Sequence, residues 1–162
     1  MTAAVALGLF GCGAVVRGQE KGRLEANWTG GDKGRMSGHA TALWCGAGKT
    51  AQLTAIQGDT GLGFLIHATD SLVAGRYPIV DAASARARAP SAALGLRLIA
   101  QAAVVGYQGR SGTLTLEQVG GARISGRFDA KAIPAAMSAG SISVNGRFLD
   151  VAVAPGGLEC PP

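Results

Sequence analysis

The chain has 162 residues and a net charge of +5, and 48% of its residues are hydrophobic. This length suits a single domain with enough apolar side chains for a buried core. Its Lys and Arg residues are scattered and only 5% of its residues are aromatic, which argues against nucleic acid as a partner, because such surfaces combine clustered basic side chains with stacking aromatics. Anionic lipid suits this excess of positive charge better.

The first element is an apolar segment at the N-terminus. Residues 1–16 carry no charge, and they are too few for a membrane-spanning helix, which needs about 20 apolar residues. They have the length of the apolar region of a secretory signal. The motif at residues 9–12, LFGC, places an aliphatic residue three positions before a cysteine and a small residue directly before it. This motif resembles the lipobox of bacterial lipoproteins.

That resemblance implies how the mature chain is organised. Residues 1–11 would be a signal-peptide-like segment, Cys12 would carry lipid, and residues 12–23 would form a polar, Gly-rich tether. The protein would then be anchored to membrane lipid outside the cytoplasm, in the periplasm or cell envelope. Two alternatives remain open. One is an uncleaved anchor, for which the basic residues at 17–23 would place the domain in the cytoplasm; the other is an apolar tail of a cytosolic protein.

From Leu24 onward, apolar and polar residues alternate, as they do in half-buried strands. Residues 82–93 predict a loop with a helical turn, and Pro78 suits an edge strand because proline donates no hydrogen bond to a ladder. Residues 94–104 favour a strand, with a helix as the alternative, and Asn145-Gly146 is a hairpin or bulge signal. The expected strands cover residues 24–29, 36–44, 53–57, 62–67, 72–80, 94–104, 113–117 and 124–130, and two apolar runs at 142–144 and 148–153 lie on either side of Asn145-Gly146.

Residues 24–162 are therefore expected to form one all-β domain. Eight or nine short strands separated by Gly-rich turns predict an antiparallel β-sandwich or a small β-barrel. The layout resembles the small all-β lipoproteins of bacterial envelopes. If Cys12 carries lipid, as this resemblance implies, Cys45 and Cys160 remain as a pair in an oxidising compartment, and we expect a disulfide between them.

Two short motifs that resemble catalytic or binding loops are interpreted as turns. Residues 46–50, GAGKT, end like a phosphate-binding loop. However, Leu43 stands where the first glycine of that loop belongs, and a strand rather than a helix follows. Residues 59–61, DTG, match the catalytic triplet of aspartic proteases, but the same residues are common in turns.

No cluster of residues predicts catalysis or metal binding. His39 and His67 are the two histidines, and no third ligand at a suitable spacing accompanies them. An enzyme would need carboxylates that converge in a cleft, for which Asp59, Asp129 and Asp150 are the candidates. We therefore expect no enzyme activity, no metal and no cofactor.

Trp28, Met36 and Trp44 are expected on one face of the sheet. They predict either a core filled by two large rings or the floor of an apolar pocket, as in lipocalin-like barrels. Only 15% of the residues are charged; the ordinary explanation is that Gly and Ala take the place of charged residues, and the alternative is a surface partly covered by a membrane or a protein partner. The sequence thus predicts a non-catalytic, membrane-anchored domain with a structural or interaction role in a membrane or envelope complex. The alternative is a binding module for a small apolar ligand.

Overall fold

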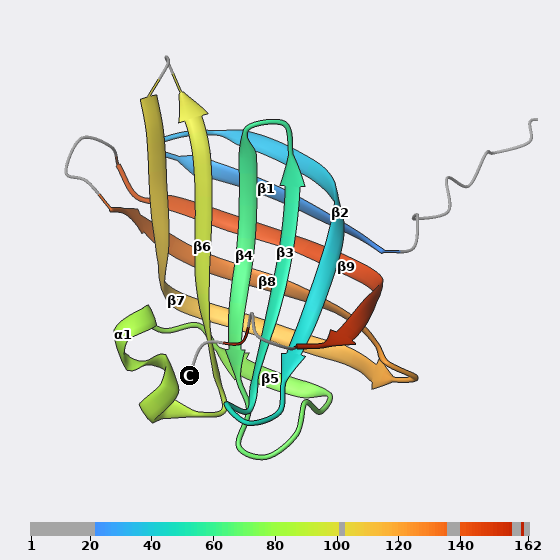
Figure 1. Ribbon diagram of the computed structural model, residues 1–162. Helices are drawn as coiled ribbons and strands as arrows, with labels where there is room; N and C mark the ends of the chain where they lie inside the picture. The colour runs from blue at the N-terminus through green and yellow to red at the C-terminus, as the bar shows by residue number, and fades with distance from the viewer. Residues whose placement is uncertain (1–21, 101–102, 136–139, 157–159, 161–162) are drawn as a thin grey trace, which may run out of the picture.

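The computed structural model describes residues 22–100, 103–135, 140–156 and 160. These residues form nine β-strands and two short helical segments, so the all-β prediction is confirmed (Figure 1). The strands are β1 (Arg23–Gly30), β2 (Gly34–Cys45), β3 (Thr50–Gln57), β4 (Thr60–His67), β5 (Gly75–Pro78), β6 (Ser91–Ala100), β7 (Ala103–Gly120), β8 (Arg123–Pro134) and β9 (Ile142–Pro155). The helix α1 (Ala82–Ala85) and the 3-10 turn η1 (Arg86–Arg88) lie between β5 and β6.

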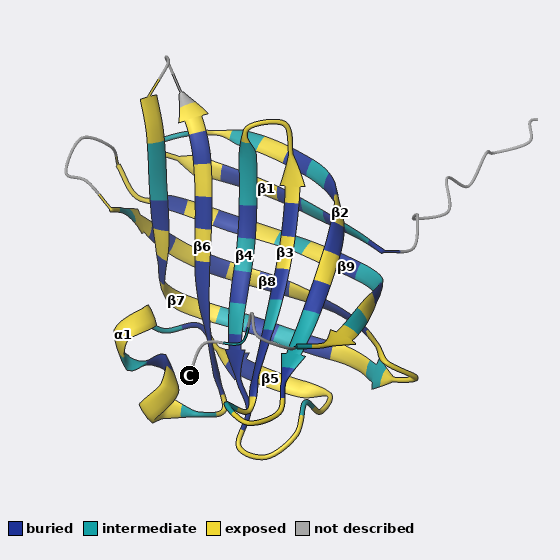
Figure 2. Ribbon diagram, viewed as in Figure 1, coloured by how far each residue is buried: buried dark blue, intermediate teal, exposed yellow. Residues whose placement is uncertain are grey.

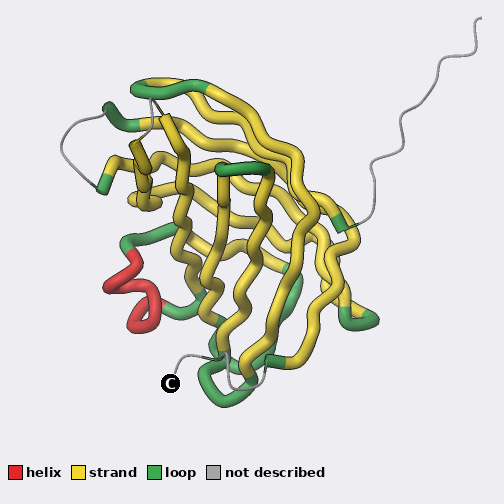
Figure 3. The backbone as a smooth tube through the Cα atoms, turned by 45° about the horizontal axis from the view of Figure 1, so that its top comes forward, coloured by secondary structure: helices red, strands yellow, loops and turns green. Residues whose placement is uncertain are grey.

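Eight of these strands close into an antiparallel barrel. Around the wall they follow the order β7-β6-β4-β3-β2-β1-β9-β8, and the pairing of β8 with β7 closes the ring (Figure 1, Figure 3). The ninth strand, β5, pairs with β7 at the fork where β7 leaves β6. Of the two predicted architectures, the barrel is the correct one.

The connections define two ends of the barrel. The connections after β1, β3, β6 and β8 share one end, which we call the hairpin end. The connections after β2, β4 and β7 share the other, which we call the disulfide end. This follows from the antiparallel wall, in which every second connection returns to the same edge.

The first strand enters the wall through a fork. β1 lies between β2 and β9 from Arg23 onward, whereas before its start β2 and β9 pair directly in parallel. Gly22 closes the fork, because its amide donates to the Leu149 carbonyl and its own carbonyl accepts from the Ala40 amide. Gly22 therefore joins the barrel in the side of the wall and not at either end.

Side chains fill the interior of the barrel. Buried and exposed residues alternate along the strands at the front and at the back of the barrel (Figure 2). β1, β2 and β3 contribute five alanines together with Leu24, Trp28, Met36 and Leu53, while β4, β6, β7, β8 and β9 contribute most of the other large inward residues. Phe64 of β4 and Phe128 of β8 meet with ring centroids 4.9 Å apart, although their strands are not neighbours in the wall. The buried alanines of the first three strands are Ala26, Ala40, Ala42, Ala51 and Ala55.

The predicted single strand over residues 94–104 is wrong. β6 ends at Ala100 and β7 begins at Ala103, so this stretch forms a hairpin. Both arms are apolar and no Gly, Asn or Pro separates them, which is why the alternation of the two arms resembles that of one strand. The predicted strand over 113–117 lies within the longer strand β7.

The turn or bulge predicted at Asn145-Gly146 is also wrong. Both residues lie in a regular part of β9, where they pair with Asp129 and Phe128 of β8. Gly146 is required there for close approach, because a Cβ atom would overlap the Glu25 carbonyl of β1 and the Phe128 ring. The irregularity in β9 falls further on, at a residue with a positive φ of 52°, Asp150.

Candidate functional site

Cys45 and Cys160 form the predicted disulfide. Their Cα atoms are 5.6 Å apart and 115 positions separate them in the sequence. Cys45 ends β2 on the outer face, and Gly156 lies against the bond, because a Cβ at that position would overlap both sulfur atoms. The bond ties the chain after β9 to the barrel wall. Because such bonds form in oxidising compartments, it indicates a location outside the cytoplasm.

Cys12, the predicted lipidation site, lies outside the described residues, together with residues 1–11 and most of the predicted tether. Strand β1 begins at Arg23, the last residue of that tether. In the part of the chain that the structure describes, no helix is long and apolar enough to cross a membrane.

The three residues of the predicted apolar pocket point into the barrel but do not line one cavity. Trp28 is buried over Gly34, where a Cβ would overlap its indole ring. Trp44 lies eight positions beyond Met36 on β2, which is roughly 26 Å at a strand rise of about 3.3 Å per residue. Trp28 thus packs near the hairpin end and Trp44 near the disulfide end, so the two rings serve different parts of the core.

An apolar cavity of about 390 Å³ opens at the disulfide end, and Trp44 forms part of its wall. The loop after β4 contributes Leu72, and the paired strand positions Val119 of β7 and Ile124 of β8 contribute their side chains. Arg123, which forms an ion pair with Asp150 at 3.4 Å, also lines it. A small apolar molecule is the kind of ligand that fits such a lining. The remaining lining residues are Ser71, Gly120, Ala122, Val153, Ala154 and Pro155.

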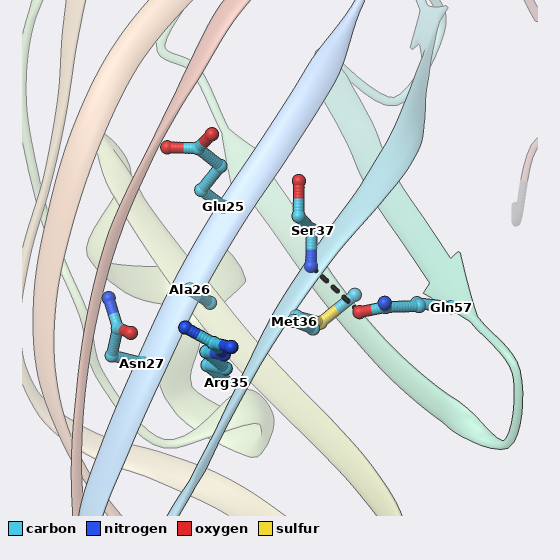
Figure 4. A pocket seen from close by; sticks show the side chains of 7 residues that line it. All are labelled: Glu25, Ala26, Asn27, Arg35, Met36, Ser37 and Gln57. Atoms are coloured by element: carbon cyan, nitrogen blue, oxygen red, sulfur yellow. Dashed lines mark hydrogen bonds between the residues drawn. The ribbon is translucent and has the colours of Figure 1, made fainter.

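A second, polar groove of about 540 Å³ lies on the outer face near the hairpin end (Figure 4). β3 ends at Gln57, so Ser37 of β2 has no strand partner on this side, and its amide donates to Gln57 Oε1 over 2.8 Å. Glu25, on the opposite wall of the groove, accepts an ion pair from Arg147 of β9 at 3.1 Å. These polar groups therefore stabilise one another. The other lining residues are Ala26, Asn27, Arg35 and Met36.

The β6–β7 hairpin projects beyond its neighbours at the hairpin end. The last pair between β6 and β4 on this side is Arg97 with Gly61, and the last pair between β7 and β8 is Tyr107 with Pro134. Beyond these pairs, apart from the bond that the Ala135 amide donates to the Gly106 carbonyl, β6 and β7 pair with no other strand among the described residues than each other. Figure 1 shows this two-stranded ribbon, in yellow, rising past the β3–β4 turn.

Exposed aliphatic residues gather around this ribbon. Ile99 and Val104 face each other across its outer side, with exposed fractions of 46% and 67%. Ile56, beside the β3–β4 turn, and Ile133, near the end of β8, are 58% and 39% exposed. Of the five large hydrophobic residues that are exposed in the described part of the chain, these four share one end, and the fifth, Val73, lies at the other.

The buried His67 belongs to a structural row on the outer face of the wall. It pairs with Thr50 of β3 on one side and Ser91 of β6 on the other, and all three are buried. The Ser91 hydroxyl donates to the Ala85 carbonyl of α1 over 2.6 Å. Burial, and then the positive charge of Arg86, lower the pKa of His67 below its ordinary value. The row thus joins the helical segment to the wall.

The carboxylates that an enzyme would need do not come together. Asp59 lies in the β3–β4 turn, Asp129 is exposed on β8, and Asp150 pairs with Arg123 at the β9 irregularity. Residues 46–49 form the β2–β3 turn, as predicted. Among the described residues, no group of three or more His, Cys, Asp and Glu side chains is placed to hold a metal ion.

The projecting hairpin is the feature that the sequence prediction missed. Its signal is present: residues 98–109 carry no charge, and the two halves of the stretch are apolar on both the inward and the outward side. A strand with one solvated face would show polar residues at every second position.

Comparison of the chain with protein-family models, with curated proteins and with solved structures gave no match. Its function is therefore inferred from its own residues.

Proposed function

We propose that this protein is a non-catalytic β-barrel domain, held at a membrane outside the cytoplasm by an acylated Cys12, that serves as an interaction subunit of a membrane or envelope assembly. The observation that carries this proposal is the Cys45–Cys160 disulfide, because such bonds persist outside the reducing cytoplasm. Export is also what the lipobox-like motif at residues 9–12 implies.

The filled interior supports an interaction role over carriage of a ligand along the barrel axis. An eight-stranded barrel is just wide enough to be filled by side chains or to hold one small ligand. Here the Phe64 and Phe128 rings are buried and meet inside the barrel. Four of the five large hydrophobic residues that are exposed among the described residues lie at the hairpin end, and exposed apolar residues gathered in one region suit contact with a membrane or a protein partner.

Native membranes from the source cells provide the test. Detergent extracts are analysed for the mass of the N-terminal peptide and for proteins that cross-link to the barrel, with a Cys12→Ala chain as the control. We expect an acylated N-terminal Cys12, membrane retention that is lost in Cys12→Ala, and at least one cross-linked protein. An unmodified Met1 on a chain that salt releases from the membrane would refute the anchor. Acylated protein without any cross-linked partner would refute the interaction role.

A second candidate function is binding of a small apolar ligand at the disulfide end, which the cavity beside Trp44 favours. Titration of the full chain with a brominated fatty acid should quench Trp fluorescence. Trp28→Phe should keep this response and Trp44→Phe should lose it, because Trp44 lines the cavity and Trp28 does not. Absence of quenching, or equal quenching in both variants, would exclude a ligand at this position.

A further inference from the structure

The β6–β7 ribbon exposes apolar side chains that are not part of the barrel core. Ile99 and Val104 lie on its outer side, away from the core, and pair only with each other across the two strands. The ribbon extends past the last β4 partner by residues 98–100 of β6, which is about 10 Å at the strand rise. The outer side of this projecting ribbon packs against no other described strand, so the ribbon is stabilised when an apolar phase covers that side.

Two long stretches of the sequence that lead to this end contain no charged residues, and charged side chains lie on either side of them. Residues 98–109 and 132–146 contain no Lys, Arg, Asp or Glu. In the turns and within three positions of the strand ends here, four basic residues stand against two acidic ones, an excess of two positive charges; Asp129 and the ion pair of Glu25 and Arg147 lie further from this end. The basic residues are Lys33, Arg35, Arg97 and Lys131, and the acidic residues are Asp32 and Asp59. Apolar side chains at the tip of the hairpin, with basic side chains around them, match the interface of an anionic bilayer.

The proposed tether is long enough to bring the same end to the membrane. The ten residue steps from Cys12 to Gly22 span at most about 36 Å when the chain is extended. β1 runs from Arg23 to Gly30 at the hairpin end, which is about 23 Å at the strand rise. A lipid on Cys12 and the β6–β7 ribbon can therefore reach one bilayer.

We propose that the β6–β7 hairpin docks the barrel onto a bilayer rich in anionic lipid. Ile99 and Val104 enter the boundary between headgroups and acyl chains, and the surrounding Arg and Lys side chains contact lipid phosphates. The depth is shallow, about 5–10 Å, because the unpaired outer edges of β6 and β7 must stay where water or headgroups can satisfy their backbone groups. This inference rests on the proposed attachment through Cys12 and adds an orientation to it: the hairpin end faces the membrane.

The test uses two exposed valines as matched reporter positions. Val104 is 67% exposed on the hairpin and Val73 is 55% exposed at the opposite end of the barrel. The full-length acylated chains Val104→Trp and Val73→Trp are bound to vesicles that contain anionic lipid and brominated acyl chains, and the signal of Trp28 and Trp44 is subtracted with the parent protein. We expect Val104→Trp to shift to shorter wavelength and lose emission, and Val73→Trp to do neither. Vesicles without anionic lipid should weaken the effect.

The outcomes separate docking from attachment. Equal emission of both reporters on protein that floats with the vesicles would overturn docking and leave the Cys12 anchor in place. Failure of the acylated protein to float would instead refute the anchor. A wavelength shift of Val104→Trp that depends on protein concentration and needs no vesicles would also overturn the proposal, because a second copy of the chain would then cover the hairpin.

Discussion

The ring of Phe64 on β4 contacts the ring of Phe128 on β8 in the centre of the barrel, with the two planes inclined by 61°. Their strands are separated in the wall by β6 and β7, so this edge-to-face contact spans the interior. Such pairs contribute about 0.5–1.5 kcal/mol beyond the area that they bury. The two buried rings therefore occupy space inside the barrel between β4 and β8.

Phe64→Ala is expected to lower the free energy of unfolding by about 3–5 kcal/mol, because it removes a large buried ring and leaves a cavity. Denaturant unfolding followed by circular dichroism measures this loss. The matched control is Ile56→Ala on the neighbouring β3, where the side chain is exposed, and its effect should stay within about 0.5 kcal/mol. Equal losses in the two variants would contradict a packed interior at Phe64.

Removal of the disulfide in a Cys45→Ala/Cys160→Ala chain is expected to destabilise the barrel by about 4–5 kcal/mol, because the bond closes a loop of more than 100 residues in the unfolded chain. Chemical denaturation with and without reductant measures it. Reductant should shift the midpoint of the parent protein and leave that of the double variant unchanged. A parent protein that is indifferent to reductant would show that the bond is absent in solution.

His67 should make stability depend on pH. Its pKa is lowered from 6.5 first by burial and then by Arg86, so the unfolded chain takes up a proton at a higher pH than the folded one. The stability that neutral His67 provides is complete above about pH 6.5 and is lost as the pH falls through and below that value. Thermal melts between pH 8 and pH 5 should therefore show a smaller decline for His67→Gln than for the parent.

The other histidine provides the control for this pH experiment. His39 is exposed on the outer face of β2, so His39→Gln should keep the full decline of the parent protein. If His39→Gln removed the decline and His67→Gln kept it, the assignment to the buried row of Thr50, His67 and Ser91 would be wrong.

Two glycines with opposite surroundings should respond in opposite directions to alanine. Gly146→Ala should cost roughly 2 kcal/mol or more, because the new Cβ would overlap the Glu25 carbonyl and the Phe128 ring, and backbone cannot move aside cheaply. A Cβ at Gly95 on β6 would meet no atom within 4 Å, so Gly95→Ala should stabilise the barrel by about 0.4–1 kcal/mol through the unfolded state. Differential scanning calorimetry of the pair checks both signs.

Residues with local signals were predicted correctly. The turn at 46–49, the turn expected within 58–61 and found at 58–59, and the all-β class all follow from neighbours a few positions apart. Asn145-Gly146 failed for a non-local reason: that glycine is needed for close contact with Phe128 and Glu25, which lie on other strands, and not for a turn. The 94–104 stretch failed because no Gly, Asn or Pro marks its turn.

Some features of the candidate site could also be predicted from the sequence, and others could not. The Cys45–Cys160 pair followed from cysteine number and the implied compartment, and the structure confirms it. Trp28 and Trp44 were correctly placed on one inward face. The prediction of a shared pocket did not take into account the eight positions that separate Met36 from Trp44 on one strand, a spacing that places the two rings near opposite ends. Cys12 and the tether remain a prediction.

The order of residues along the chain was enough to predict a single β-domain with tight turns, because alternation and turn chemistry act over a few residues and need no partner. Three features emerged only from the folded barrel: the sheet closes through β7 and β8, aromatic rings fill its centre, and the β6–β7 ribbon projects with Ile99 and Val104 exposed. These features depend on which strands become neighbours, and that choice is made by packing across the whole chain.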